Sequence, residues 1–406
     1  MRKKLRDEDE EEEHANILYI ILFYLLGTVC YIPHNFYVTA NEYWMYKFRN
    51  PQIPFDDGNT KQKTDLQKQF TAYAGLAVHK MIIGGMVSML LLFLSTLLFI
   101  FIDTDTWQSG FFIIALAVNF LLSACFGILM TSLFRLSNKF HRRCLAAQFA
   151  GQATCGILSA VMEIISLAAV SSVKGTAALY FTVASIAIAG IMVCYISIEK
   201  KSEEFSSKLK LVTEEQSQRI QKGKSAVNLN VLKRLLRHLA LLILALFFCV
   251  GNSSILHPGL TSLIESYGKG SSTWSDTYFV PVCVFLIHNL FDFIGREASN
   301  YFPKLENIYV IGIISVIRLA LFPLIIFCNL QPRNNLPVVF DDDSYFIIFF
   351  ILFAVLGGYL MNVVIIVVPK YCEPNERTMG TVLVAVILIV FVPVFALLSS
   401  VFVNLI

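Results

Sequence analysis

Apolar runs that are long enough to cross a membrane recur along almost the whole chain. A helix needs about 20 consecutive apolar residues to span the hydrocarbon core of a bilayer. Runs of that length lie at 17–44, 72–102, 111–134, 145–171, 176–198, 237–265, 277–298, 305–329, 344–370 and 378–405. Because a spanning segment must satisfy its backbone polar groups internally, this repetition predicts an all-α, polytopic membrane protein with about ten spans.

The composition favours the same class and disfavours catalysis. Of the 406 residues, 56% are hydrophobic and 15% are charged, whereas soluble domains carry about 25% charged residues. The nine cysteines lie in or beside apolar runs, so no disulfide framework is expected. The sequence shows no Cys/His cluster with metal-ligand spacing and no glycine-rich phosphate loop. We therefore expect no enzyme activity, no cofactor, no metal and no nucleic-acid partner.

A polar segment divides the chain into two apolar halves. Residues 1–16 form a charged terminus that is too acidic for a signal peptide, and we expect it in the cytoplasm. The N-terminal transmembrane half covers 17–198 and the C-terminal half covers 237–406. Between them, residues 199–236 are rich in Lys, Glu, Ser and Gln, which predicts a cytoplasmic linker. The linker ends in an amphipathic stretch at 231–237.

The charges of the loops predict an orientation and also reveal a discrepancy. Short basic loops stay in the cytoplasm, which places 135–143 inside and the acidic loops 103–110 and 340–344 outside. With a cytoplasmic N-terminus, the first two apolar runs would then both cross outward, which consecutive spans cannot do. Three explanations are open: an external N-terminus, two short crossings within 70–102, or the absence of one span between residues 45 and 85.

The run 277–298 carries a carboxylate and a guanidinium at membrane depth. Asn289, Asp292 and Arg296 follow i, i+3, i+7 spacing and therefore share one helix face. Ionisable groups in a span cost about 2.5–3.5 kcal/mol each on insertion scales, so they usually mark functional positions. Such a stripe can either line a wet pathway or fasten one helix to another.

A second polar stripe lies in the run 145–171. It consists of Gln148, Gln152, Gly156, Ser159 and Glu163. These residues share one helix face, which suits either a wet cavity or close helix packing. Arg318, near the middle of its run, can snorkel, pair with an acid or act in a pathway. Two apolar halves with polar stripes in both predict an alternating-access carrier for a polar substrate without net charge.

Several motifs resemble those of the equilibrative nucleoside transporter family, in the same order along nearly the whole chain. They lie at 270–281, 289–296, 318–329, 32–40 and 151–156. The Asn-x-x-Asp-x-x-Gly-Arg block at 289–296 is highly specific. The resemblance implies a major-facilitator-like fold of eleven spans, in which two helical halves surround a central cavity.

The resemblance also implies a function and a site. The family moves nucleosides, and in some members nucleobases, down their gradient, with the plasma membrane as the default location. Residues that match Asp292 and Arg296 hold the ribose hydroxyls, and one that matches Gln152 holds the base. Asn289 shares the face of the pair. The first-span residues that would border the cavity are Tyr31, His34 and Asn35. The family typically has Trp where this chain has His34.

One departure from the family pattern bears on the orientation discrepancy. Residues 70–75 resemble the start of the family's second span and residues 82–86 the start of its third, so the resemblance implies that most of the second span is absent. This motivates an alternative function, a non-transporting membrane variant that binds or retains full-length partners. A weaker alternative is an ion-coupled symporter with Glu163 as its proton site. The oligomeric state is left open.

Overall fold

In the computed structural model, all regular secondary structure of the described residues is helical. These residues are 16–39, 82–137, 140, 142–209, 229–301, 307–333 and 335–373, with short pieces between 376 and 403. Within them, six helices are long and apolar enough to cross a membrane. The prediction of an all-α membrane protein is therefore confirmed. The segment that should hold the second span lies outside the described residues.

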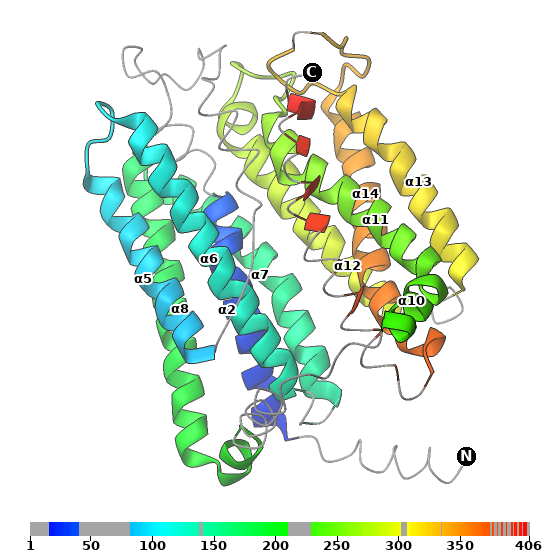
Figure 1. Cartoon of the computed structure of the whole chain (residues 1–406). Helices are drawn as coiled ribbons and strands as arrows, with labels where there is room; N and C mark the ends of the chain where they lie inside the picture. Colours follow the sequence, from blue (N-terminus) through cyan, green and yellow to red (C-terminus); the bar gives the residue numbers. More distant parts are fainter. Residues whose placement is uncertain are drawn as a thin grey trace.

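The N-terminal half is a bundle of long apolar helices (Figure 1). Its members are α2 (Ile17–Thr39), α5 (Ile82–Phe101), α6 (Gln108–Ser137), α7 (Arg142–Ala169) and α8 (Val173–Lys201). Its core is built from aromatic and aliphatic side chains, and the buried rings of Phe93 and Phe181 meet edge to face with centroids 5.4 Å apart. Burial of these side chains between helices leaves outward aliphatic residues such as Leu91 and Leu98 exposed, as expected for a surface in contact with lipid.

The C-terminal half begins with a short amphipathic helix that leads directly into a span. Its α-helices are α10 (Leu229–His238), α11 (Ala240–Ile255), α12 (Ile287–Tyr301), α13 (Ile308–Ile326) and α14 (Asp343–Val367). Shorter elements join them: η2 (Leu256–Leu260), η3 (Thr261–Leu263), η4 (Trp274–Tyr278), η5 (Val280–Leu286) and η7 (Val368–Tyr371). The amphipathic stretch expected at the end of the linker thus lies in α10.

The span that carries the charged stripe is not a uniform α-helix. Residues of η4 and η5 form wide π-helical turns, and regular α-helix begins only at Ile287. Pro281 lies at the start of η5, where its missing N–H limits regular helical bonding. Such π segments are frequent at functional sites. Asn289, Asp292 and Arg296 all lie beyond this segment, so the face predicted from helical spacing is present in α12.

Loops with similar charge lie at the same end of the molecule. Figure 1 shows the α5–α6 and α13–α14 connections at one end, and the end of α8 together with α10 at the other. The first two connections contain the acidic loops 103–110 and 340–344, whereas α8 ends on Lys200 and Lys201. This arrangement agrees with the orientation inferred from the positive-inside rule.

In the N-terminal half, α2 and α7 cross with their backbones in contact. A Cβ added to Gly151 would lie 2.0 Å from the carbonyl oxygen of Tyr24, and one added to Gly27 would lie 2.1 Å from that of Gln148. No side chain fits at these distances. Each helix therefore supplies a glycine at the point where the other helix approaches, as close packing between membrane helices requires.

In the C-terminal half, glycines allow the same close backbone contact between α12 and α14. A Cβ on Gly295 would lie 2.1 Å from the carbonyl oxygen of Val355, and one on Gly358 would lie 2.0 Å from that of Asp292. The second contact occurs at the residue that carries the carboxylate of the charged stripe. The backbone position of Asp292 is therefore set by contact with α14.

Substitution of the crossing glycines should destabilise the helix pairs. Gly151→Ala and Gly358→Ala each place a methyl group against a rigid backbone carbonyl, so we expect each to lower the free energy of unfolding by about 1–3 kcal/mol. Gly312→Ala in α13 is the matched control, because nothing lies within 4 Å of its added Cβ. Thermal unfolding of the purified proteins measures the difference. Equal midpoints for Gly358→Ala and Gly312→Ala would contradict the close crossing.

Candidate functional site

An ion pair on one face of α12 forms the centre of the candidate site. The Nε atom of Arg296 donates to Oδ2 of Asp292 across 2.6 Å, one helical turn apart. Their side chains are 29% and 19% exposed, respectively. Pairing compensates the two charges and lowers the penalty of holding them at membrane depth. Because neither side chain is fully buried, a ligand can reach both an acceptor and a donor at one place.

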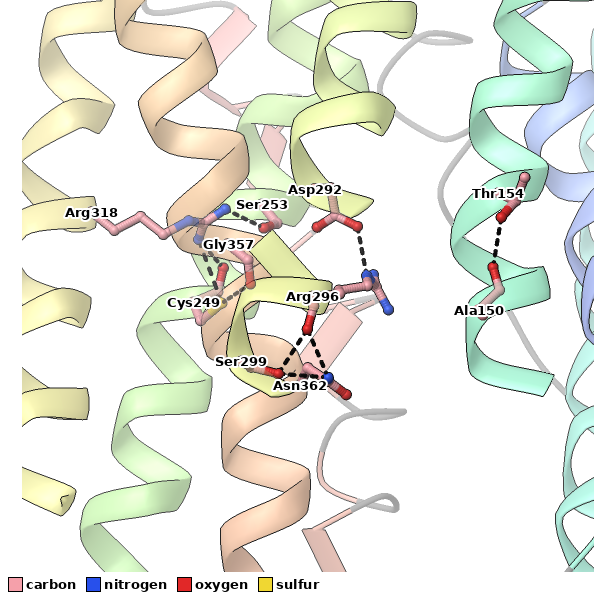
Figure 2. Close-up of polar contacts among 10 residues, drawn as sticks. All are labelled: Ala150, Thr154, Cys249, Ser253, Asp292, Arg296, Ser299, Arg318, Gly357 and Asn362. Atoms are coloured by element: carbon pink, nitrogen blue, oxygen red, sulfur yellow. Dashed lines mark hydrogen bonds and ion pairs between the residues drawn. The ribbon is translucent and has the colours of Figure 1, made fainter. Parts of the chain in front are cut away.

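Hydrogen bonds hold α12 to α14 at the level of Arg296. The Nδ2 atom of Asn362 donates to the carbonyl oxygen of Arg296 (3.0 Å) and to Oγ of Ser299 (2.7 Å). Ser299 in turn donates to the same carbonyl (2.7 Å), as Figure 2 shows. This network and the Gly295 crossing fix the helix that carries the ion pair. Neither Asn362 nor Ser299 was identified from the sequence, although Asn362 is a polar side chain within an apolar run.

Asn289 lies where α12 meets α7. Its Nδ2 donates to the carbonyl oxygen of Phe285 (2.8 Å), which turns Oδ1 toward Gly156 of α7. A Cβ on Gly156 would lie 2.1 Å from that oxygen. The predicted stripes of the two halves therefore touch at this point, and Gly156 provides the space for the contact.

Gln152 lies one helical turn before Gly156, about 6 Å along the axis of α7. It is 5% exposed, and its Nε2 is 3.1 Å from the thioether sulfur of Met130 in α6. A thioether is a weak acceptor, so this contact holds the amide only loosely. Among the described contacts, none joins Gln152 to Asp292 or Arg296. Figure 2 shows Arg296 pointing from α12 toward the side on which α7 lies.

The other predicted site residues are placed only in part. The helix α2 includes Tyr31, His34 and Asn35. Only the backbone of these three residues is described, so their side chains are not placed. The remaining polar members of the α7 stripe are all buried: Gln148, Ser159 and Glu163. In this conformation the stripe therefore lies between packed helices.

Arg318 fastens three helices of the C-terminal half. It is 1% exposed, and its guanidinium donates to the carbonyl oxygens of Cys249 (2.6 Å) and Phe353 (3.0 Å) and to Oγ of Ser253 (2.7 Å). It also lies 3.8 Å from the centre of the Phe353 ring. The expectation that Arg318 snorkels or pairs with an acid is wrong for the described part of the chain, because backbone and hydroxyl acceptors surround it instead.

Two histidine rings stack on one another in the C-terminal half, and one of them, His288, precedes Asn289 in the sequence. The rings of His257, at the kink after α11, and His288 have centroids 3.9 Å apart and planes 21° apart. Nδ1 of His257 lies 3.0 Å from Oγ1 of Thr261, while Nδ1 of His288 is buried with no hydrogen-bond partner among the described residues. Neither histidine was singled out from the sequence. No described group of His, Cys, Asp and Glu side chains could hold a metal ion.

Arg318 should be essential for stability. Arg318→Met removes the charged donor of three hydrogen bonds, to Cys249, Ser253 and Phe353, and hydrogen bonds to charged groups contribute about 1.5–3 kcal/mol each. We expect a large drop in the thermal unfolding midpoint and in the yield of monodisperse protein. Arg318→Lys should recover only part of the loss, since an ammonium lacks the planar fork of donors. A fully stable Arg318→Met protein would contradict the fastening role.

Comparisons with known proteins identify the family. A family model described as "Nucleoside transporter" matches residues 115–404. The chain is 28% identical to equilibrative nucleoside transporter 3 of Rattus norvegicus, over 91% of this chain and 85% of that protein. It is 26% identical to equilibrative nucleoside transporter 1 of Homo sapiens, over 89% and 92%. It is 24% identical to equilibrative nucleoside transporter 2 of Mus musculus, over 88% and 90%. Since the family model covers well over half of the sequence, the chain belongs to the equilibrative nucleoside transporter family.

Proposed function

We propose that this protein carries nucleosides across a membrane by equilibrative transport with alternating access. The observation that carries the proposal is the Asp292–Arg296 ion pair, which is partly exposed and fixed on α12 at membrane depth. A carboxylate accepts hydrogen bonds and a guanidinium donates them, so together they match the hydroxyl groups of a ribose. The pair has no net charge, which suits an uncharged substrate.

The base would be recognised from the other half of the protein. Gln152 offers one amide donor pair and one carbonyl acceptor, the combination that pairs with the polar edge of a nucleobase. Its weak contact with Met130 can be exchanged for a stronger bond to substrate. Tyr31, His34 and Asn35 of the first span would complete the wall of the cavity.

The contact between Asn289 and Gly156 suggests how the halves move. It lies between α12 and α7, one turn from both Gln152 and the ion pair. Rocking of the two halves around a bound substrate would open and close this contact, as alternating access requires. A major-facilitator-like arrangement of about ten spans, in the plasma membrane, belongs to the same proposal, as does transport of nucleobases.

The lengths of the alignments support the alternative function, a non-transporting membrane variant. The alignment with the human relative extends over 423 residues, more than the 406 of this chain, so the relative has residues that this chain lacks. An absent second span would have this effect, and it would also explain the orientation discrepancy. A chain that lacks one wall of the cavity would bind or retain full-length partners without transporting.

Uptake by the full 406-residue chain separates the two functions. In cells without endogenous nucleoside transporters, we expect labelled uridine or adenosine to enter faster than in mock-transfected cells and to equilibrate without accumulation. A panel of nucleosides and nucleobases at acidic and neutral pH would define selectivity and detect proton coupling. Absence of uptake by protein that is folded and present at the cell surface would reject transport and favour the alternative.

Substitution of the ion pair tests the site. Asp292→Ala and Arg296→Ala each remove a charged hydrogen-bonding group, which contributes about 1.5–3 kcal/mol, so kcat/KM for a nucleoside should fall about tenfold or more. Glu203→Ala, at an exposed position after α8, is the matched control and should transport normally. Surface expression must be equal for all variants. Unchanged uptake in both ion-pair variants would show that the substrate is held elsewhere.

A further inference from the structure

The short helix α10 is fixed at the membrane surface by its connection to α11. Only Leu239 separates the last residue of α10 from the first residue of the span, Ala240. Leu235 and Leu239 are fully buried in one cluster with Val368 and Cys372, at the end of α14. The helix therefore lies at the depth where the hydrocarbon core gives way to lipid headgroups, at the end of the molecule inferred to be cytoplasmic.

One basic residue of α10 is already neutralised within the protein. Arg234 forms ion pairs with Glu373, across 3.4 Å, and with Glu376. The hydrogen bond from Arg234 to Glu376 is the main cause of a raised pKa for the guanidinium. Both glutamates follow η7 in the sequence, so Arg234 ties α10 to the segment that precedes the last apolar run.

The face of α10 that points away from the protein carries two further cations and an apolar side chain. Lys233 and Arg237 are one turn apart and exposed, and Leu236, 39% exposed, lies beside them on the helix surface. At about 100° per residue, Lys233 and Arg237 are on the side opposite Leu235 and Leu239, and Leu236 lies between the two sides. Within the described residues, no ion pair engages Lys233 or Arg237.

We propose that Lys233, Leu236 and Arg237 form a binding site for anionic phospholipid headgroups of the cytoplasmic leaflet. The two cations would hold the phosphate and carboxylate groups of the lipid, while Leu236 enters the boundary with the acyl chains. Basic amphipathic helices bind membrane surfaces in this way. The connection to α11 keeps this face beside the bilayer, which favours lipid over a soluble acidic protein as its occupant.

Lipid binding and the Arg234 contact would act on neighbouring sides of one helix. The outer face would hold α10 to the bilayer, and Arg234 holds it to the segment before the last apolar run. Anionic lipid would thus stabilise the C-terminal half as a whole. This inference does not depend on transport, because its readouts are lipid binding and thermal unfolding.

The test compares lipid responses of the purified full-length chain. In nanodiscs of phosphatidylcholine, addition of phosphatidylserine should raise the unfolding midpoint of the wild type but not of Lys233→Gln/Arg237→Gln. Native mass spectrometry should show about fivefold weaker phosphatidylserine retention for each charge removed, and about 25-fold for both. Lys174→Gln, an exposed cation at the opposite end of the molecule, is the matched control and should respond as the wild type does.

Three results would overturn the proposal. The first is a double variant that responds to phosphatidylserine as strongly as the wild type. The second is an equal effect of soluble glycerophosphoserine, which would indicate a site for a free anion rather than for a bilayer. The third is a wild type that ignores phosphatidylserine but binds calcium-loaded calmodulin through α10. Arg234→Gln serves as the structural comparison and should lower the midpoint equally in neutral and anionic nanodiscs.

Discussion

Direct backbone contact between α12 and α14 is the constraint on which the candidate site depends. Gly295 and Gly358 remove the side chains that would separate the two helices, and the carbonyl oxygen of Asp292 lies at the contact. Without hydrophobic driving force between helices in lipid, such close packing and interhelical hydrogen bonds hold the pair together. The Asn362 and Ser299 bonds secure the same turn. These contacts hold in place the turn of α12 that carries the ion pair.

Three arginines of the C-terminal half lie in different environments. Arg296 is paired with an acid and partly exposed, which leaves it accessible to a ligand. Arg318 is enclosed by carbonyl and hydroxyl oxygens and an aromatic face, which makes it a fastening between helices. Arg234 lies outside the spans and pairs with glutamates of a neighbouring segment. The residue type is the same, and the surroundings decide its role.

Local patterns were sufficient to predict that the chain is helical and which face carries Asn289, Asp292 and Arg296. Apolar run length and helical spacing are properties of residues that are close in the sequence, so they can be recognised without knowledge of the fold. The contacts of Arg318, Asn362 and the stacked His257 and His288 were not predictable in this way. Their partners are distant in the sequence, and a lone arginine or asparagine in an apolar run gives no indication of which helix it will meet.

The sequence by itself determined the class of protein and the family, because apolar repetition and the 289–296 block are local signals. Only the tertiary structure decided which polar stripe is packed and which is accessible. The α7 stripe is buried against its neighbours, whereas the Asp292–Arg296 pair is partly exposed. Helical periodicity places residues on a shared face, but the exposure of that face depends on which helix packs against it.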